Sequence, residues 1–370
     1  MNKSELIKNL KSSPIYNMSQ DSLENFHTSF LCWLGNTYPE KFIKLFNDKR
    51  FDKTKEYNCK KQVIHTNSNK NEGNKNIRTD LEFQFNDNEL IIIENKMKSY
   101  PDYNQLEKYY DIICKEKKET TFILLSLVDK INLPKQWICI SYSDLAKKMN
   151  KIFCENVEYK KDYQDYHKCL MQDYINVINL LSKSFPEKNN EIYDLDEQKK
   201  QIIDDLQDIY IKYRTSELAN YINKEIRKKC NWEIKESFSA KSKEGVVDVI
   251  RKLDENNRFH IQIQGKQYSY GFVYLEGKST PDDIWKERIK IANKLKDQGY
   301  WFVDIKDPKR KTKCENFYSY KPDFIYRQSN KGIDEKTTYK EITNRIKKDI
   351  EKFEQNLVEI QNCIYEFVKY

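Results

Sequence analysis

Thr79-Asp80-Leu81-Glu82-Phe83-Gln84-Phe85 is a stretch in which polar and apolar side chains alternate, as in a strand with one buried face. Asn86-Asp87-Asn88 then has the composition of a turn. The segment that follows, 89–96, contains the apolar run Leu90-Ile91-Ile92-Ile93 and is typical of a returning strand buried in its middle. We therefore expect an antiparallel β-hairpin over residues 78–96.

This hairpin brings together two carboxylates and one ammonium group. Side chains on a strand alternate between faces, so Glu94 and Lys96 point the same way, and the pairing places Asp80 near both. Such a trio suits Mg²⁺ and a phosphate. Because 34% of the residues are charged, a trio at this spacing also arises by chance. The position of Glu94 after four aliphatic residues favours the metal site, since an unpaired carboxylate is costly there.

An amphipathic helix is predicted directly after the hairpin, over residues 102–117. Pro101 suits the first turn of a helix, and Gln105 and Tyr109 lie four residues apart on one helix face. Taken alone, this pair is typical of a solvated amide and a half-buried ring. Directly after the Glu-x-Lys strand, the same pair favours a role in the site.

Asp80, then Glu94-Asn95-Lys96, then Gln105-Leu106-Glu107-Lys108-Tyr109 resembles the motif of the PD-(D/E)XK nuclease superfamily, in particular its exonuclease-like QxxxY branch. The resemblance covers about residues 19–150. Thr79 stands where the name-giving proline would be, and Asn95 occupies the variable position. No carboxylate or lysine of the motif is missing, so the resemblance implies an active site.

The resemblance implies the following roles at the hairpin. Asp80 and Glu94 would bind Mg²⁺ or Mn²⁺, with the main-chain carbonyl at Asn95 as a further candidate ligand. Lys96 would stabilise the pentacovalent phosphate or orient the attacking water. The reaction implied is metal-dependent hydrolysis of a phosphodiester bond.

Further roles are implied on two helices. Gln105 and Tyr109 would position the scissile strand. The stretch 24–34 looks like the opening helix of an uncharacterised bacterial family of the superfamily, and Glu24 would hold a water or a second metal ion. The alternative for Glu24 is that it fills a polar gap near the core. His27 could bind metal, orient a water, or fill a polar gap near the core.

The order of predicted elements gives the fold class, α/β. A restriction-endonuclease-like α/β/α core with a mixed sheet is expected from the hairpin, its helix and three further strands at 56–64, 120–128 and 136–140. Two helices at 162–184 and 196–229 are separated by the polar segment 185–190, a plausible domain boundary. We place the nuclease domain, with its closing helices, at residues 1–187.

Residues 188–370 are predicted to form a second, α+β domain with an antiparallel sheet, acting in recognition or regulation. Four strand-like runs are followed by a helix at 281–298, a strand at 300–305 and one long C-terminal helix at 335–369. The four runs are 232–238, 245–253, 258–266 and 268–276. The long helix could pack within its domain or pair with a second copy of the chain, so a homodimer is a possible partner state.

Two patterns in the second domain leave its role open. Asp248 and Gln262-Ile263-Gln264 repeat the spacing of Asp80 and Glu94-Asn95-Lys96, through either a decayed duplication or a coincidence of two hairpins. Aromatic residues also recur at alternate positions, and so on one sheet face, where they could stack bases, contact a partner or fill the core. These residues are Tyr268, Tyr270, Phe272 and Tyr274.

Composition is compatible with a polyanionic partner. There are 66 basic and 58 acidic residues, a formal net charge of +8, and 26 tyrosines that could stack on bases. An AT-rich genome produces similar enrichment, so composition alone does not decide. Nine cysteines without a C-x-x-C pair, no membrane-spanning run and no signal-peptide core predict a cytoplasmic protein that does not enter membranes.

The sequence as a whole therefore predicts a Mg²⁺-dependent deoxyribonuclease, a hydrolase with nucleic acid as its partner and DNA favoured over RNA. Defence against phages or plasmids follows by analogy, because no helicase or methylase motif accompanies the nuclease motif. The alternatives are a non-catalytic nucleic-acid-binding protein and a protein-interaction scaffold, either of which would have kept the fold.

Overall fold

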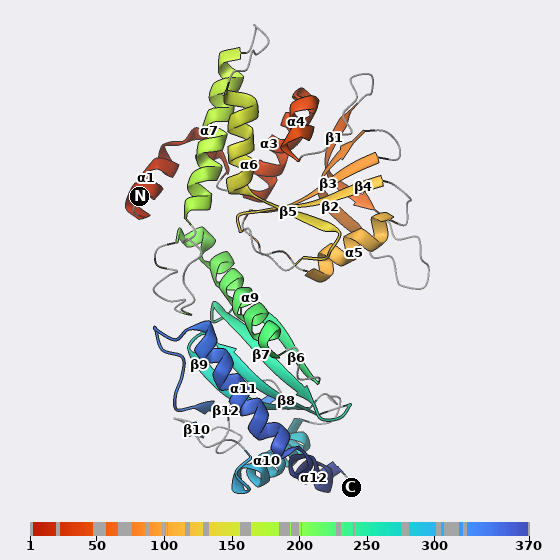
Figure 1. Cartoon of the computed structure of the whole chain (residues 1–370), viewed down its shortest axis with the longest axis vertical. Helices are drawn as coiled ribbons and strands as arrows, with labels where there is room; N and C mark the ends of the chain where they lie inside the picture. Colours follow the sequence, from red (N-terminus) through yellow and green to blue (C-terminus); the bar gives the residue numbers. More distant parts are fainter. Residues whose placement is uncertain are drawn as a thin grey trace. The chain divides into compact units, whose positions relative to one another are not determined.

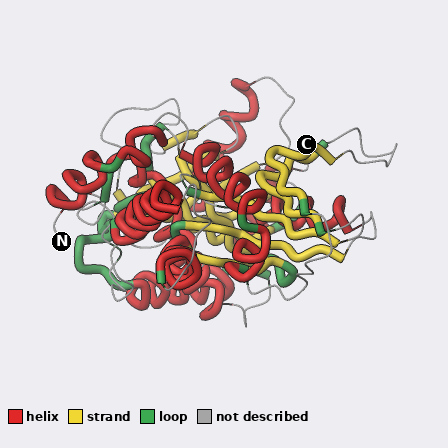
Figure 2. Tube along the Cα trace, turned by 90° about the horizontal axis from the view of Figure 1, so that it is seen from above, coloured by secondary structure: helices red, strands yellow, loops and turns green. Residues whose placement is uncertain are grey.

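The structure is a computed structural model of the whole chain (Figure 1, Figure 2). It describes residues 3–19, 23–46, 57–65, 76–85, 89–97, 99, 101, 103–114, 119–128, 133–155, 164–184, 193, 200, 202–226, 231–239, 241–255, 257–274, 281–300, 305–306, 318–320 and 324–368. The polar insert before the hairpin, the hairpin turn and the segment 185–190 lie outside these ranges, apart from residue 76. So does most of the strand predicted at 300–305.

The chain divides into two compact units. The first contains Met1–Pro186 and Lys200–Tyr210, and the second contains Glu187–Lys199 and Ile211–Tyr370. Among the described helices of both units, none combines the length and the apolar character needed to cross a membrane.

The first unit is built on a mixed five-stranded sheet with strand order β1-β2-β3-β4-β5. Its strands are β1 (Asn58–His65), β2 (Ile77–Gln84), β3 (Glu89–Lys96), β4 (Glu119–Ser126) and β5 (Trp137–Ser141). Pairing is antiparallel from β1 to β3 and parallel from β3 to β5. This confirms the predicted hairpin and the mixed sheet.

Helices cover both faces of this sheet, as the α/β/α prediction requires (Figure 1). One face carries α3, α4, α6 and α7, and the other carries α5. The helices are α1 (Lys3–Ser12), α2 (Pro14–Ser19), α3 (Leu23–Thr37), α4 (Pro39–Leu45), α5 (Tyr103–Cys114), α6 (Tyr142–Met149), α7 (Gln164–Lys183), a π-helical turn (Asn150–Cys154) and a 3₁₀ turn (Asp204–Leu206).

Strand β3 lies in the middle of the sheet and is buried on both faces. Ile91 and Ile93 belong to the core under α3, whereas Leu90 and Ile92 belong to the core under α5. The strict alternation of the strand explains why four consecutive aliphatic residues are needed here. It also sends Glu94 toward the α5 face.

The second unit contains an antiparallel sheet with strand order β10-β12-β9-β8-β7-β6, and β11 pairs with β12. The strands are β6 (Trp232–Ser239), β7 (Glu244–Lys252), β8 (Asn257–Gln264), β9 (Gln267–Tyr274), β10 (Ile305–Lys306), β11 (Tyr318–Tyr320) and β12 (Phe324–Ser329). The helices are α9 (Gln207–Ile226), which belongs to this unit from Ile211 onward, α10 (Pro281–Asp297), α11 (Tyr339–Gln355) and α12 (Leu357–Val368). The four predicted strand runs are confirmed, while β11 and β12 were not predicted.

The prediction of a single long C-terminal helix at 335–369 is wrong, because the chain forms two helices there, α11 and α12. The backbone leaves the helical conformation at Asn356 (φ −113°, ψ 17°), whose side-chain amide donates to the carbonyl of Lys352. Beyond this break α12 packs against α10. The side chains of Ile346, Ile350 and Phe353 are buried in the core of the second unit, so α11 packs within the unit.

The sheet of the second unit shows how to interpret the two sequence patterns whose role was left open, the alternating aromatic residues and the repeated spacing. Tyr268, Tyr270 and Phe272 are buried in the core, which excludes them as a base-stacking surface. Asp248 lies directly opposite Gln262, whose amide donates to it at 2.9 Å. The described strands here are all antiparallel, unlike the mixed first sheet, so the repeated spacing reflects two similar hairpins.

Candidate active site

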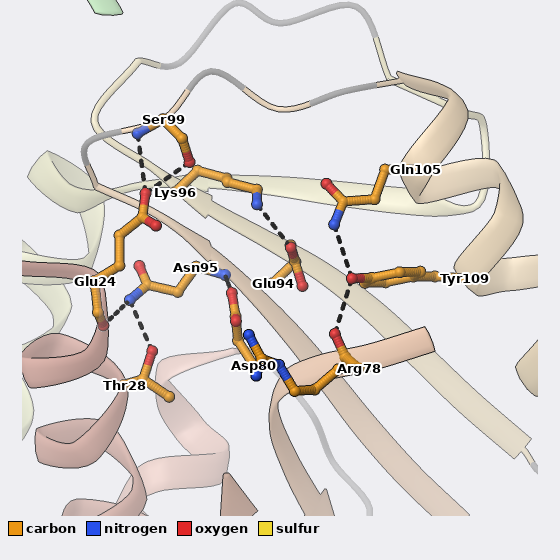
Figure 3. Close-up of polar contacts among 10 residues, drawn as sticks. All are labelled: Glu24, Thr28, Arg78, Asp80, Glu94, Asn95, Lys96, Ser99, Gln105 and Tyr109. Carbon is orange, nitrogen blue, oxygen red and sulfur yellow. Dashed lines mark hydrogen bonds and ion pairs between the residues drawn. The ribbon is translucent and has the colours of Figure 1, made fainter. Parts of the chain in front are cut away.

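Asp80 lies at the point where the pairing between β2 and β3 stops. Leu81 and Ile93 form the last pair, and their neighbours Asp80 and Glu94 lie just beyond it. Beyond this point the main-chain N–H of Asn95 donates to Asp80 Oδ2 at 2.8 Å, so the carboxylate replaces a strand carbonyl (Figure 3). The end of the strand pairing therefore fixes this carboxylate beside Glu94.

The other side of Asp80 is also irregular. Pairing between β1 and β2 skips Gln62, which has a left-handed backbone with φ 53°. Ile77 belongs to the core under α5, but Leu81 belongs to the core under α3, although residues four apart on a regular strand share a face. The alternation of side chains between the two faces of the sheet is thus interrupted in β2 around Asp80, and such irregularities are common next to active sites.

Glu94 and Lys96 lie on the same face of β3, as predicted. Lys96 Nζ contacts Glu94 Oε1 at 2.8 Å. The Glu94 side chain is buried, and its second oxygen, Oε2, has no hydrogen-bond partner among the described residues. A buried carboxylate oxygen without a partner is costly, and a bound cation would compensate it.

The electrostatics of the site follow from this burial. Burial, and then the nearby charge of Asp80, raises the pKa of Glu94 to about 7 despite the ammonium group of Lys96. Burial also raises the pKa of Asp80, although the N–H of Asn95 opposes it. For Lys96, burial acts to lower the pKa, but the charge of Glu94 and its hydrogen bond outweigh burial and raise it. The site holds more negative charge than Lys96 balances, which favours a divalent cation.

Helix α5 directs two polar side chains toward this cluster. Gln105 Nε2 donates to Tyr109 Oη at 2.8 Å, and Tyr109 Oη donates to the carbonyl of Arg78 in β2, also at 2.8 Å (Figure 3). Leu106 and Ile113, on the buried side of α5, hold the helix on the sheet. The structure therefore brings the Gln-x-x-x-Tyr pair to the same sheet face as Glu94 and Lys96.

Asn95 points to the opposite face of the sheet and ties it to α3 (Figure 3). Its Nδ2 donates to the carbonyl of Glu24 and to Thr28 Oγ1, each at 3.0 Å, while its Oδ1 accepts from Tyr142 Oη. In the motif this position is variable and neutral, and its partners Thr28 and Tyr142 were not predicted. The available signal was an amide inside a buried strand, which requires partners.

Glu24 lies near the cluster but is engaged elsewhere. Its Oε1 accepts from the main-chain N–H of Ser99 at 2.9 Å and from Ser99 Oγ at 2.6 Å. Its charge contributes to raising the pKa of Glu94, so Glu24 belongs to the electrostatic surroundings of the site. Ser99, just after the Glu-x-Lys strand, was not predicted.

Within the described residues, the contacts of His27 are with aromatic side chains and not with the carboxylates. It is fully buried, with Nδ1 3.0 Å from Tyr174 Oη, and Nε2 has no partner within the described part of the chain. Burial lowers the pKa of His27 to about 3. Of the roles considered for this residue, the contacts favour filling a polar gap in the core.

The residues of the cluster fit a Mg²⁺ or Mn²⁺ ion held partly by water. In the described ranges, no three histidine, cysteine or acidic side chains are grouped closely enough to enclose a metal ion. Asp80 and Glu94 offer two carboxylates, one with the unpartnered Oε2, and Mg²⁺ commonly binds through one or two carboxylates and several waters. The donor set is therefore that of an open, oxygen-rich site.

Comparison with known proteins found one family whose sequence model matches this part of the chain. Residues 15–176 match the sequence model of the PD-(D/E)XK nuclease superfamily. The match contains the hairpin, α3 and α5. Searches of curated proteins and of solved structures found no match.

Proposed function

We propose that the chain is a metal-dependent nuclease that hydrolyses phosphodiester bonds in DNA. The observation that carries this proposal is the buried Glu94 carboxylate: Oε1 is held by Lys96, and Oε2 lacks a partner in the described structure. The match of residues 15–176 to the model of a nuclease superfamily supports this chemistry for the geometry.

In this proposal Asp80 and Glu94 hold the metal ion, and the main-chain carbonyl of Asn95 is a further ligand. The bound ion supplies Lewis-acid polarisation of the scissile phosphate and activates water near neutral pH. The N–H of Asn95 fixes the orientation of Asp80 at 2.8 Å, which preorganises the site before the ion binds.

The remaining residues act on the phosphate. Lys96, charged and next to Glu94, stabilises the negative charge that develops on the phosphoryl oxygens. Gln105 and Tyr109 position the scissile strand, and Glu24 assists in holding a water or a second ion. Water adds to phosphorus in line, the P–O3′ bond breaks, and the products carry a 3′-hydroxyl and a 5′-phosphate.

The choice of DNA and a role in defence against phages or plasmids rest on the resemblance to bacterial nucleases. The second unit then serves as the recognition or regulatory part of the chain. A homodimer would supply two active sites, one for each strand of a duplex.

Cleavage assays on linear, circular and single-stranded DNA and on RNA, with Mg²⁺ or Mn²⁺, test the proposal. Lys96→Ala and Glu94→Gln should abolish metal-dependent cleavage. Glu107→Gln is the matched control, because this exposed carboxylate lies on α5 outside the cluster and should leave cleavage unchanged. The circular substrate separates endonuclease from exonuclease action.

Other outcomes identify the alternatives. Equal cleavage by wild type and both site variants would place the activity elsewhere and reject the site. Salt-dependent binding of polynucleotide without cleavage would indicate a nucleic-acid-binding protein. Neither binding nor cleavage would indicate a protein-interaction scaffold.

A further inference from the structure

The second unit contains a cavity of about 580 Å³ between the loop that follows β12 and the first half of α11. Its lining includes the cationic residues Lys331, Lys336, Arg345 and Lys348. This volume lies within the range of small-molecule sites, roughly 300–1,000 Å³. The cavity belongs entirely to the second unit, so its description is independent of the candidate active site.

The loop side of the cavity is held in place by main-chain contacts. The N–H of Ile333 donates to the carbonyl of Lys266 at 2.9 Å. A Cβ at Gly332 would lie 2.7 Å from that same carbonyl, so only glycine fits there. Arg345 donates from Nη1 to the carbonyl of Lys331 and from Nη2 to Ser329 Oγ. The wall is therefore formed before any ligand binds, which lowers the cost of binding.

Arg345 holds this wall through its guanidinium group. Its two terminal nitrogens are used in the loop contacts, and its guanidinium lies 3.8 Å from the centre of the Tyr268 ring. Tyr268 is buried and donates its hydroxyl to Asp349 at 2.8 Å. The loop bonds and the ring contact therefore give Arg345 a structural role in the wall of the cavity.

Three lysines provide the free positive charge of the cavity. Lys331, Lys336 and Lys348 are exposed, and within the described residues their ammonium groups form no ion pair. The acidic residues of the lining, Asp334 and Glu341, use their carboxylates locally. Hydrogen bonds to neighbouring residues lower the pKa of both groups and keep them charged.

These local bonds belong to the turn that starts α11. Glu341 completes a capping box with Thr338, accepting from its N–H at 2.8 Å. Asp334 accepts from the N–H of Lys336 and from Thr337 Oγ1. The acids therefore stabilise the helix start, and the lysines remain available.

We propose that this cavity binds the phosphate group of a small, nucleotide-sized molecule. Separate ammonium groups act as point charges and suit a compact anion with several acceptor oxygens, whereas planar recognition of a carboxylate favours the fork of an arginine. The same phosphate chemistry is present in inorganic pyrophosphate, in a mononucleotide and at the end of an oligonucleotide, and the test separates these sources.

Isothermal titration calorimetry on the full chain tests this site directly. The probes are inorganic pyrophosphate, adenosine monophosphate and a short 5′-phosphorylated DNA oligonucleotide, each in EDTA. Using the Glu94→Gln background keeps nuclease chemistry out of the measurement, so failure here is distinct from failure of the proposed function. The test variant is Lys331→Gln/Lys348→Gln, and the control is Lys340→Gln, an exposed lysine on α11 outside the lining.

The expected result is saturable binding of pyrophosphate or the mononucleotide, weakened about tenfold or more in the double variant and unchanged in the control. Equal binding by the double variant would overturn the proposal, as would the absence of saturable binding for every probe. Binding of the oligonucleotide alone would also overturn it, since the surface would then contact nucleic acid. Thermal midpoints of all variants establish that each remains folded.

Discussion

The side chain of Asp80 and the main-chain N–H of Asn95 are joined by a hydrogen bond of 2.8 Å, formed where the strand pairing of the hairpin has ended. One residue of the motif thus orients another through the backbone. The Asp80 carboxylate has two tasks, satisfying a strand N–H and supplying charge to the site. Substitutions that separate these tasks give distinct predictions.

Asp80→Asn should abolish cleavage with little loss of stability, because the amide oxygen can still accept the N–H of Asn95 while the negative charge is gone. Asp80→Ala should abolish cleavage and also lower the free energy of unfolding by about 1–2 kcal/mol, since the N–H loses its acceptor. Cleavage assays and urea unfolding without metal check both. Equal stability of the two variants would show that the hydrogen bond does not support the strand.

Metal ions should stabilise the wild-type chain. A ligand that binds only the folded state adds about 2.7 kcal/mol at a hundred times its dissociation constant, which would raise the thermal midpoint by about 5 °C or more. Glu94→Gln should remove this rise, because the buried Oε2 is the free acceptor of the site. Scanning calorimetry with Mn²⁺ and with EDTA measures it. A rise of the same size in Glu94→Gln would place the metal elsewhere.

Tyr109→Phe should affect positioning and leave metal binding intact. The hydroxyl connects Gln105 to the carbonyl of Arg78, and its loss should cost about 1 kcal/mol in unfolding free energy. With the bond between Gln105 and Tyr109 lost, cleavage should fall about tenfold or more because the scissile strand is less well placed. The Mn²⁺-induced rise in thermal midpoint should remain, and its loss would make Tyr109 part of the metal site.

Asn95→Ala should lower both stability and cleavage. The substitution leaves Thr28 Oγ1 and Tyr142 Oη without their amide partner, at a cost of about 2–4 kcal/mol in unfolding free energy. It also releases the contact between β3 and the start of α3, where Glu24 lies. Urea unfolding and cleavage rates measure the two effects.

Asn36→Ala is the control for that experiment. The Asn36 amide also joins α3 to a strand, donating to the carbonyl of Cys59 and accepting from its N–H, but in β1 and away from the carboxylates. This variant should lose about 1 kcal/mol of stability and keep its cleavage rate. If both variants lost cleavage equally, general loosening of α3 would explain the effect of Asn95→Ala.

The hairpin and its charged trio could be predicted because they depend on local patterns. Alternation placed Glu94 and Lys96 on one face, and the turn composition brought Asp80 back beside them. The contacts of Asn95 depend on partners distant in the sequence, Thr28 and Tyr142, and no periodicity encodes them. Gln62, opposite Asp80, has a left-handed backbone, but it is not a glycine, so the sequence does not indicate this conformation.

The break in the C-terminal helix was missed for a related reason. The apolar positions continue at helical spacing from Phe353 through Leu357 to Ile360, so the pattern predicts one helix. Asn356 ends α11 by bonding its own side chain to Lys352, and the packing of α12 on α10 depends on contacts between distant segments. A polar side chain that caps a helix from within an apolar repeat leaves only a weak sequence signal.

The His27 imidazole should make the first unit sensitive to acid. Burial lowers its pKa from 6.5 to about 3, so in the window between these values the unfolded chain binds a proton that the folded chain does not. The contribution of His27 to the free energy of unfolding is therefore present above pH 6.5 and is lost as the pH falls toward 3. This single group should remove about 2 kcal/mol between pH 7 and pH 5.

His27→Gln isolates that contribution, because glutamine can keep a hydrogen bond to Tyr174 and does not titrate. Packing losses should lower its stability at pH 7, yet its unfolding free energy should fall less steeply from pH 7 to pH 5 than that of the wild type. His167→Gln, at a half-buried ring hydrogen-bonded to Tyr38, serves as the control for removing a histidine from the same unit. Urea unfolding at a series of pH values gives the slopes. Parallel slopes for wild type and His27→Gln would mean that the buried ring takes up its proton in the folded chain, and that the core around Tyr174 opens more readily than its burial indicates.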